Sequence, residues 1–153
     1  MSVFTHVTRR ALEPFLSGYD VGKLMNFHGI SEGVENTNYF VDTSRGRFVL
    51  TVFERLDYEQ LPYFLGLMAH LNAGGVATPA PVLTRDGALH ATLMGKPAAL
   101  VERIPGIGVA DASERQCAAI GHCMAEVHAA GQGFEGHRLP DRGADWWKAT
   151  ADA

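Results

Sequence analysis

The sequence predicts an α+β fold: a five-stranded antiparallel sheet with one long helix, followed by a mainly helical region. Two observations lead to this prediction. Short segments bounded by turn residues, as expected of strands, lie on both sides of one long apolar stripe at helical spacing. After residue 104 only helical spacing remains. The chain has 153 residues, which is long enough to bury a sizeable core.

A short helix is expected first, between Thr8 and Tyr19, because Leu12 and Leu16 recur there at helical spacing. Pro14 lies in this stretch. Proline is tolerated in a helix only near the first turn, so Pro14 counts against a helix here.

Three strands of an antiparallel meander are expected next, within residues 23–54. The stretch TSRGR contains turn-forming residues and marks the last turn. In the third strand, alternation assigns the side chains to two faces. Phe48, Leu50 and Val52 share one face, and Val49, Thr51 and Phe53 share the other.

One long helix separates the meander from the remaining strands. Its apolar stripe consists of Leu61, Phe64, Leu65, Met68 and Leu71. Asp57 is expected as the N-cap, and the glycines of NAGG mark the C-terminal end. The prolines of ATPAPV then require extended backbone, and turns at Asp86-Gly87 and around Gly95 divide the following residues into two or three strands.

A second region is expected from PGIGV onward, so the chain divides into residues 1–104 and 105–153. A helix begins at Ser113, and another begins around Trp146 and Trp147. The apolar face of the first of these helices consists of Cys117, Ile120, Met124 and Val127. Too little sequence follows to cover this face, so we expect the chain to be a fragment of a longer protein.

Composition and charge exclude two classes of partner. The net charge of −4 leaves no basic stripe for nucleic acid or an anionic membrane, and no apolar run is long enough to cross a bilayer. Cys117 and Cys123 lie about 240° apart around a helix axis, so they are not expected to pair. Without a recognisable secretory signal, the expected location is the cytoplasm. The sequence does not indicate an oligomeric state.

The loop SEGVEN, between the first two predicted strands, has two interpretations. The glycine-rich dinucleotide fingerprint and the Walker phosphate loop are both absent from the sequence. Ser31, Gly33 and Asn36 could turn their backbone N–H groups toward an anion, as backbone nests do. The same residue types are common in plain hairpin connections, and the loop taken alone favours that simpler interpretation.

Six sequence blocks follow one another along nearly the whole chain. They are GISEGVENTNYFV, RFVLTVFE, GVATPAPV, GKPAALVERIPG, GHCMAEVHAA and RGADWW. In this order they resemble the type II homoserine kinases, a branch of the protein-kinase-like phosphotransferases that includes the aminoglycoside phosphotransferase and choline kinase group. The ordered set is specific, although no single block is. The resemblance implies a kinase-like N-lobe in residues 1–104, then a hinge and the first helices of a C-lobe.

The resemblance implies roles for two segments. The loop covering the ATP phosphates would contain Ser31, Glu32, Gly33, Glu35 and Asn36. The hinge, whose backbone N–H and C=O groups would meet the adenine edge, would consist of Val101, Glu102, Arg103 and Ile104. Without the resemblance, residues 101–104 are equally well interpreted as an edge strand.

Thr51 departs from the wider superfamily, in which a lysine on the third strand holds the α- and β-phosphates. The resemblance makes threonine a feature of this branch and assigns Thr51 to the nucleotide site. It leaves open which group neutralises the phosphates. Glu59 would be the counterpart of the usual glutamate partner, but without a lysine it is better interpreted as a solvated helix residue.

No metal site and no catalytic residue are predicted in this chain. His122 and Glu126 stand one helical turn apart, but a structural zinc ion needs four ligands. The resemblance implies an aspartate base and Mg²⁺ ligands in an HxDxxxxN pattern and a following acidic strand. None of the seven histidines begins this pattern; His137, for example, leads HRLPDRGA.

The activity implied by the resemblance is transfer of the γ-phosphoryl group of Mg-ATP to the hydroxyl of L-homoserine, a step toward threonine. The 153 residues alone are expected to be inactive. Two alternatives stay open. The first is a related kinase acting on choline, hydroxylysine or an aminoglycoside, and the second is a non-catalytic nucleotide-binding remnant.

Overall fold

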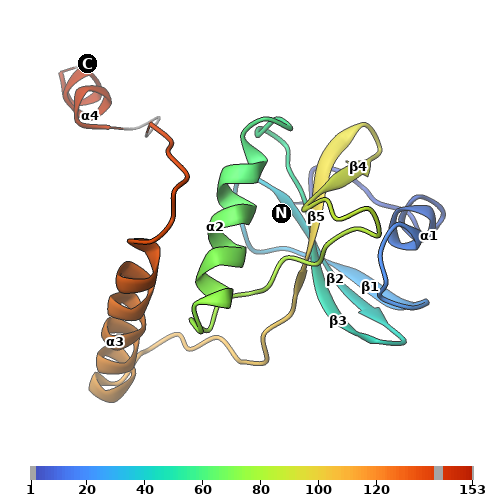
Figure 1. Cartoon of the computed structure of the whole chain (residues 1–153), viewed down its shortest axis with the longest axis horizontal. Coiled ribbons are helices and arrows are strands. Elements are labelled where there is room, and N and C mark those ends of the chain that lie inside the picture. The colour runs from blue at the N-terminus through green and yellow to red at the C-terminus, as the bar shows by residue number, and fades with distance from the viewer. Residues whose placement is uncertain (1–2, 140–142, 153) are drawn as a thin grey trace.

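The structure is a computed structural model that describes residues 3–139 and 143–152. Within these residues, five antiparallel strands form one sheet in the order β1-β2-β3-β5-β4 (Figure 1). The strands are β1 (Leu24–Ile30), β2 (Thr37–Thr43), β3 (Gly46–Val52), β4 (Ala91–Leu93) and β5 (Lys96–Glu102). The helices are α1 (Arg9–Ser17), α2 (Leu61–Ala73), α3 (Glu114–Gly131) and α4 (Ala144–Ala151). The predicted α+β architecture is confirmed.

Helix α1 forms where the sequence predicts it, and Thr8 caps it by accepting a hydrogen bond from the Ala11 N–H. The helix forms although Pro14 lies inside it, beyond the first turn. A proline at this position removes the hydrogen bond to the Arg10 carbonyl, one turn earlier. Arg10 is exposed, so water can replace that bond.

One face of the sheet is mostly covered. Alternation along β3 directs every second side chain to this face, where α1 packs against the sheet. Phe48, Leu50 and Val52 are buried there, as the sequence predicts. They belong to the larger of two hydrophobic clusters in the described residues. We name as the closed face the side chains Tyr39, Val41, Phe48, Leu50, Val52 and Leu100.

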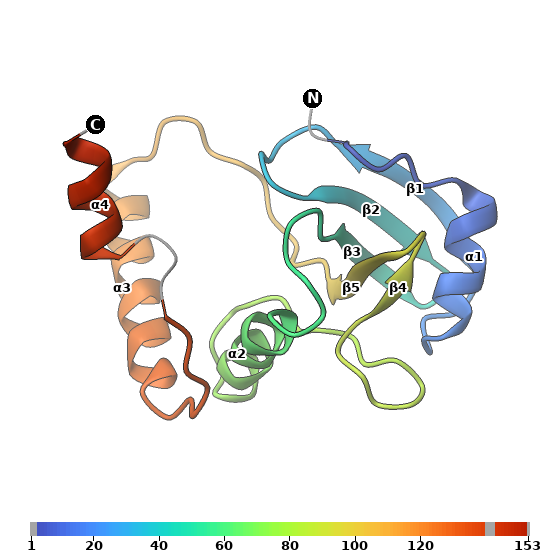
Figure 2. The same cartoon turned by 90° about the horizontal axis from the view of Figure 1, so that it is seen from above.

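The opposite face of the sheet is covered by α2 at one end. There Ala99 of β5 packs against Leu61 and Leu65 in the smaller cluster. Figure 2 shows α1 and α2 on opposite sides of the sheet. Farther from α2, the side chains on this face remain partly exposed. We name as the open face the side chains Asn38, Phe40, Val49, Thr51 and Val101.

Helix α2 ends as predicted but begins later than predicted. Its C-cap is Gly74, the first glycine of NAGG. Asp57 does not cap the helix, because its carboxylate accepts hydrogen bonds from the N–H groups of Glu59 and Gln60 in a turn that precedes Leu61. Glu59 therefore lies in this exposed turn and not on the helix.

The predicted turns and extended segment are present between α2 and the end of β5. Met94 and Gly95 both have positive φ, at 53° and 80°, and connect β4 to β5 in the tight turn that such angles allow. Gly87 also has positive φ, at 84°, in the preceding turn. The extended segment pairs with β5, because the Val82 N–H donates to the Leu100 carbonyl at 2.8 Å. This stretch forms two strands.

Helices α3 and α4 have no buried residue among those described. Ser113 forms a capping box with Gln116, which confirms the predicted start of α3. On the predicted apolar face of α3, Ile120 and Met124 are 62% and 54% exposed. Val127, at the end of this face, is partly buried beside α2.

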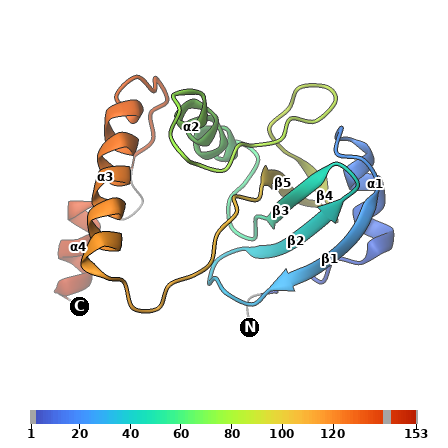
Figure 3. The ribbon, with the colours of Figure 1, turned by 90° about the horizontal axis from the view of Figure 1, so that it is seen from below.

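Helix α3 lies beside α2, and the chain reaches it from β5 through an extended segment (Figure 3). The His70 ring and the Ala130 carbonyl oxygen are hydrogen-bonded at 2.9 Å and join the two helices. Cys117 and Cys123 are both free thiols. Residues 140–142, which include the first residue of the block RGADWW, lie outside the described residues. No helix in the described part of the chain is long and apolar enough to cross a membrane.

Candidate functional site

The open face presents an apolar surface beside a polar one. Cross-strand register places Phe40 opposite Val49 and Val49 opposite Val101, so these side chains form one row across three strands. All three are partly exposed, and neither hydrophobic cluster in the described residues includes them. The next row along the same face pairs Asn38 with Thr51. A flat apolar ligand could rest on the first row while a polar extension reaches the second.

The end of β5 supplies one free backbone acceptor and one free donor. The N–H groups of Glu102 and Arg103 donate to the carbonyls of Ala80 and Arg47, at 2.9 Å and 3.0 Å. Among the described residues, no backbone partner is found for the Glu102 C=O or the Ile104 N–H. In extended backbone, groups two residues apart point to the same edge. A base that offers a donor and an acceptor on one edge, such as adenine, would complement this pair.

The interpretation of residues 101–104 as an edge strand is wrong. Strand β5 lies inside the sheet, between β3 and β4. Val101 pairs with Val49 on one side and forms a bridge with Pro81 on the other. Sequence alternation could not distinguish an edge strand from a strand that is paired on both sides. The partner at Pro81 comes from the extended segment and not from a regular strand.

The side chain of Arg103 adds a rim to the open face. Its guanidinium carbon lies 3.9 Å from the centre of the Phe40 ring, a cation–π contact. The ring of His28 lies 5.2 Å from the same phenyl ring. Phe40 is therefore in contact with His28 of β1 and with Arg103, which follows the end of β5.

The loop of residues 31–36 joins β1 to β2, and its residues up to Glu35 are exposed. Gly33 has a φ of +123°, a conformation that favours glycine. A Cβ added at Gly33 would lie 3.6 Å from the Asn38 amide nitrogen, so the loop passes close to the polar row. Asn36 is tied to the protein, because its amide oxygen accepts a hydrogen bond of 3.4 Å from the Glu54 N–H.

The structure brings Gly33, Asn38 and Thr51 together, and only Asn38 was missed from the sequence. The Thr51 hydroxyl donates to the amide oxygen of Asn38 at 2.8 Å. Asn38 lies directly opposite Thr51 in the meander. This pairing could have identified Asn38, but it requires the register of β2 on β3. Glu32 and Glu35 are exposed carboxylates, which accept hydrogen bonds but cannot donate them to a phosphate.

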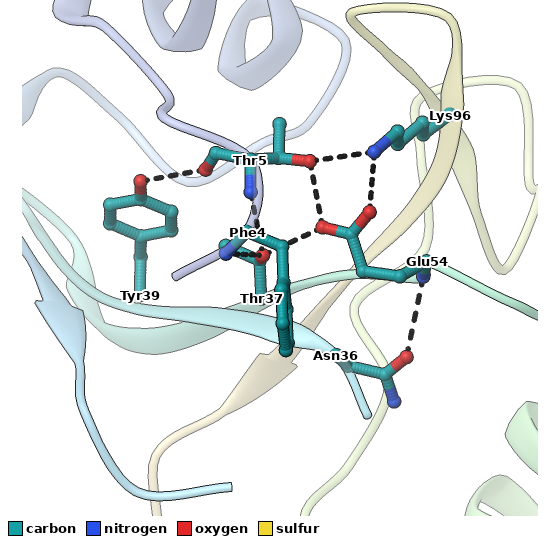
Figure 4. Close-up of polar contacts among 7 residues, drawn as sticks. All are labelled: Phe4, Thr5, Asn36, Thr37, Tyr39, Glu54 and Lys96. Carbon is teal, nitrogen blue, oxygen red and sulfur yellow. Dashed lines mark hydrogen bonds and ion pairs between the residues drawn. The ribbon is translucent and has the colours of Figure 1, made fainter. Parts of the chain in front are cut away.

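A separate polar cluster fastens the N-terminal segment to the sheet (Figure 4). Glu54 accepts hydrogen bonds from the hydroxyls of Thr5 and Thr37, both at 2.7 Å, and forms an ion pair with Lys96. The Thr37 hydroxyl also accepts a hydrogen bond of 2.9 Å from the Phe4 N–H. Burial alone would raise the pKa of Glu54, but the hydrogen bonds from Lys96, Thr37 and Thr5 lower it below the usual value for glutamate.

Lys96 is the only lysine in the five strands, and in this cluster it is paired with Glu54. Lys96 Nζ donates to the Thr5 hydroxyl at 2.9 Å in addition to its ion pair. Its ammonium group is therefore committed to the N-terminal segment and does not replace the lysine that is missing at Thr51.

Metal ligands are not grouped anywhere in the described part of the chain. No set of three or more His, Cys, Asp or Glu side chains could hold a metal ion in residues 3–139 and 143–152. His122 and Glu126 form an exposed pair on α3, 3.4 Å apart.

Comparison with known proteins decides the family. The family model for the phosphotransferase enzyme family matches residues 26–153, which is most of the chain. The chain belongs to this family. This phosphotransferase family member is 44% identical to a homoserine kinase of Xanthobacter autotrophicus over 97% of the chain and 46% of the relative. It is 45% identical to a homoserine kinase of Rhodopseudomonas palustris, over 97% of the chain and 46% of the relative.

The phosphotransferase family chain thus spans about half the length of the curated relatives it matches. Two solved structures show the same fold. A spectinomycin phosphotransferase in complex with ADP and spectinomycin matches with a TM-score of 0.68 at 13% identity, over 97% of this chain and 46% of its own. An aminoglycoside phosphotransferase matches with a TM-score of 0.52 at 19% identity, over 80% of this chain and 39% of its own. The predicted protein-kinase-like fold and the predicted resemblance to homoserine kinases are both confirmed.

Proposed function

We propose that this chain is the nucleotide-binding portion of an ATP-dependent homoserine kinase. The observation that carries the proposal is 44% identity to a homoserine kinase along 97% of the chain. In this proposal, residues 1–104 form the N-lobe, and residues 105–153 form the linker and the start of the C-lobe. The reaction is transfer of the γ-phosphoryl group of Mg-ATP to the side-chain hydroxyl of L-homoserine, in threonine biosynthesis.

The open face and the end of β5 support a specific placement of the nucleotide. Adenine rests on Val49 and Val101, and its edge meets the Glu102 C=O and the Ile104 N–H. Both apolar side chains are partly exposed. They lie side by side on the open face, and Val101 directly precedes Glu102 in β5. The phosphates then extend toward Thr51 and the loop of residues 31–36, where Ser31, Glu32, Gly33, Glu35 and Asn36 are assigned.

Phosphoryl transfer depends mainly on positioning and charge neutralisation, and the chain supplies only part of both. The described residues orient the base and the phosphates. Mg²⁺, when bound, neutralises charge on the phosphates, and in this proposal its ligands and the catalytic base lie outside the 153 residues. The chain alone therefore binds nucleotide but transfers no phosphate. We place the protein in the cytoplasm, since its two free cysteines suit a reducing compartment.

A chimera tests the proposal. The chain replaces the matching segment of the Xanthobacter autotrophicus homoserine kinase. ATP-dependent phosphorylation of homoserine is then compared with that of choline, hydroxylysine and spectinomycin. We expect homoserine-dependent turnover in the chimera and none in the chain alone. A folded chimera that binds ATP but phosphorylates no homoserine would contradict the homoserine kinase assignment. A chimera that binds ATP but phosphorylates none of these acceptors would favour the non-catalytic nucleotide-binding remnant. A chimera and a chain that both fail to bind ATP would contradict both interpretations.

A further inference from the structure

The hydrogen bond of Thr51 determines what this residue can offer a ligand. A threonine hydroxyl has one proton, and in the structure it is donated to the amide oxygen of Asn38. The Thr51 oxygen keeps only acceptor lone pairs, which a phosphate oxygen would repel. Thr51 therefore cannot donate to a phosphate while this bond is present.

The same bond orients the amide of Asn38. With its oxygen turned toward Thr51, the Asn38 side chain has both N–H donors on the other side. That side faces the loop, because a Cβ on Gly33 would lie 3.6 Å from the Asn38 nitrogen. Gly33 has no side chain, and its φ of +123° disfavours any residue that has one. At Gly33, therefore, no side chain of the loop lies against the Asn38 amide nitrogen.

We propose that Asn38 donates hydrogen bonds to a polyphosphate on the open face, and that Thr51 is a positioning residue that holds the Asn38 amide in the donating orientation. This inference rests on the proposed function and assigns a residue of its phosphate site. Amide donors suit a ligand whose charge is already partly neutralised by a cation, since they add hydrogen bonds without adding charge. The inference also explains how a site without the usual lysine on β3 can still contact phosphates, through Asn38 of β2.

Nuclear magnetic resonance provides a direct readout on the ¹⁵N-labelled 153-residue chain. The side-chain amide signals of Asn38 are identified by their loss in Asn38→Ala. ATP, tripolyphosphate and adenosine are then titrated separately in the presence of Mg²⁺. We expect the Asn38 amide signals to shift with ATP and with tripolyphosphate, and to stay in place with adenosine, which has no phosphate.

Affinity measurements on variants separate donation from positioning. Asn38→Asp keeps an acceptor for Thr51 but removes both donors, so ATP affinity should fall about tenfold or more while adenosine affinity stays the same. Asn26→Asp is the matched control, because Asn26 lies on the same side of the sheet, opposite Asp42 at the other end of β2. It makes the same chemical change away from the loop, and ATP affinity should change little.

Thr51→Val removes the hydroxyl at nearly constant volume and should weaken ATP about threefold by releasing the Asn38 amide. Thr51→Ser keeps the hydroxyl, so its ATP affinity should equal that of the wild type. If Thr51 acts through Asn38, the double variant Asn38→Ala with Thr51→Val should be no weaker than Asn38→Ala alone.

The outcomes test the proposed function separately from the roles of Asn38 and Thr51. A wild-type chain that binds neither ATP nor adenosine contradicts the proposed function, and this inference falls with it. A wild-type chain that binds ATP while the Asn38 signals stay in place, or while Asn38→Asp and Asn26→Asp behave alike, overturns the role of Asn38 and leaves the proposed function standing. Additive losses in the double variant overturn the positioning role of Thr51.

Discussion

The closed face and the open face of the sheet are built from alternate residues of the same strands, yet they differ in almost every physical property. On the closed face Leu50 and Leu100 have no exposed surface, whereas Val49 and Val101, each one residue away in sequence, are partly exposed. The closed face therefore provides most of the stability. The open face has the polar pair, the free backbone groups at the end of β5 and the glycine loop. Substitutions on the closed face should thus mainly lower stability, whereas substitutions of neighbouring residues on the open face should mainly weaken ligand binding.

The largest expected difference is between Leu50→Ala and Val49→Ala. Leu50→Ala leaves a cavity in the larger cluster and should lower the free energy of unfolding by about 2–5 kcal/mol. Val49→Ala removes partly exposed methyl groups and should cost about 1 kcal/mol or less, while it weakens ATP binding. Urea unfolding and nucleotide titration measure the two effects. Equal losses of stability would show that the two faces are equally well packed.

The polar cluster at the edge of the closed face should make stability depend on pH. The pKa of Glu54 is lowered in the folded protein, so its contribution is present above the unfolded value, near 4.3, and is lost as pH falls through the lower folded value. Glu54→Gln should cost about 1–3 kcal/mol at pH 7, and the difference from wild type should shrink below about pH 4. The exposed Glu59→Gln is the control. A pH-independent difference would mean that the ion pair with Lys96 does not stabilise the fold.

Thr51→Lys should sharpen the assignment of the open face. The side-chain partner of Thr51 in the structure is the neutral amide of Asn38, so a lysine would add a charge that Thr51 lacks. ATP affinity should rise by about 1–2 kcal/mol for a partly desolvated, charge-assisted contact. Thr51→Ala should change it by about 1 kcal/mol at most. Binding weaker than in Thr51→Val, which also lacks the hydroxyl, would indicate a cation already in place. Binding equal to that of Thr51→Val would mean that position 51 does not face the phosphates.

The smallest expected effect concerns the rim of the open face. Arg103→Gln removes the cation–π contact with Phe40 and should lower the free energy of unfolding by about 0.5–1 kcal/mol. In a double-mutant cycle with Phe40→Leu, most of this loss should disappear. Thermal unfolding of the four proteins gives the coupling energy, and a value near zero would show that the contact does not stabilise the sheet.

The sequence predicted the features that depend on local pattern. The two faces of β3, the end of α2 at Gly74 and the capped start of α3 at Ser113 follow from alternation, glycine and a short polar side chain. The start of α2 was predicted too early, because Asp57 forms a turn of its own before the helix. That choice depends on packing of Leu61 against the sheet, which no local signal records.

The candidate site was predicted less completely, because its decisive contacts join distant segments. The sequence pointed to Thr51 but could not show that its proton is donated to Asn38, since this depends on the register of β2 on β3. It pointed to residues 101–104 but could not show that two of their N–H groups are taken by Ala80 and Arg47. Both facts need the paired sheet.

A map of backbone amide shifts on addition of Mg-ATP tests the central claim, that nucleotide binds on the open face. We expect the shifts to cluster in residues 31–36, around Thr51 in β3, and at the end of β5 near Ile104. Residues of the closed face, such as Leu50, should respond only weakly. Shifts centred instead on the pocket lined by Glu13, Leu16 and Lys23 between α1 and β1 would contradict this claim.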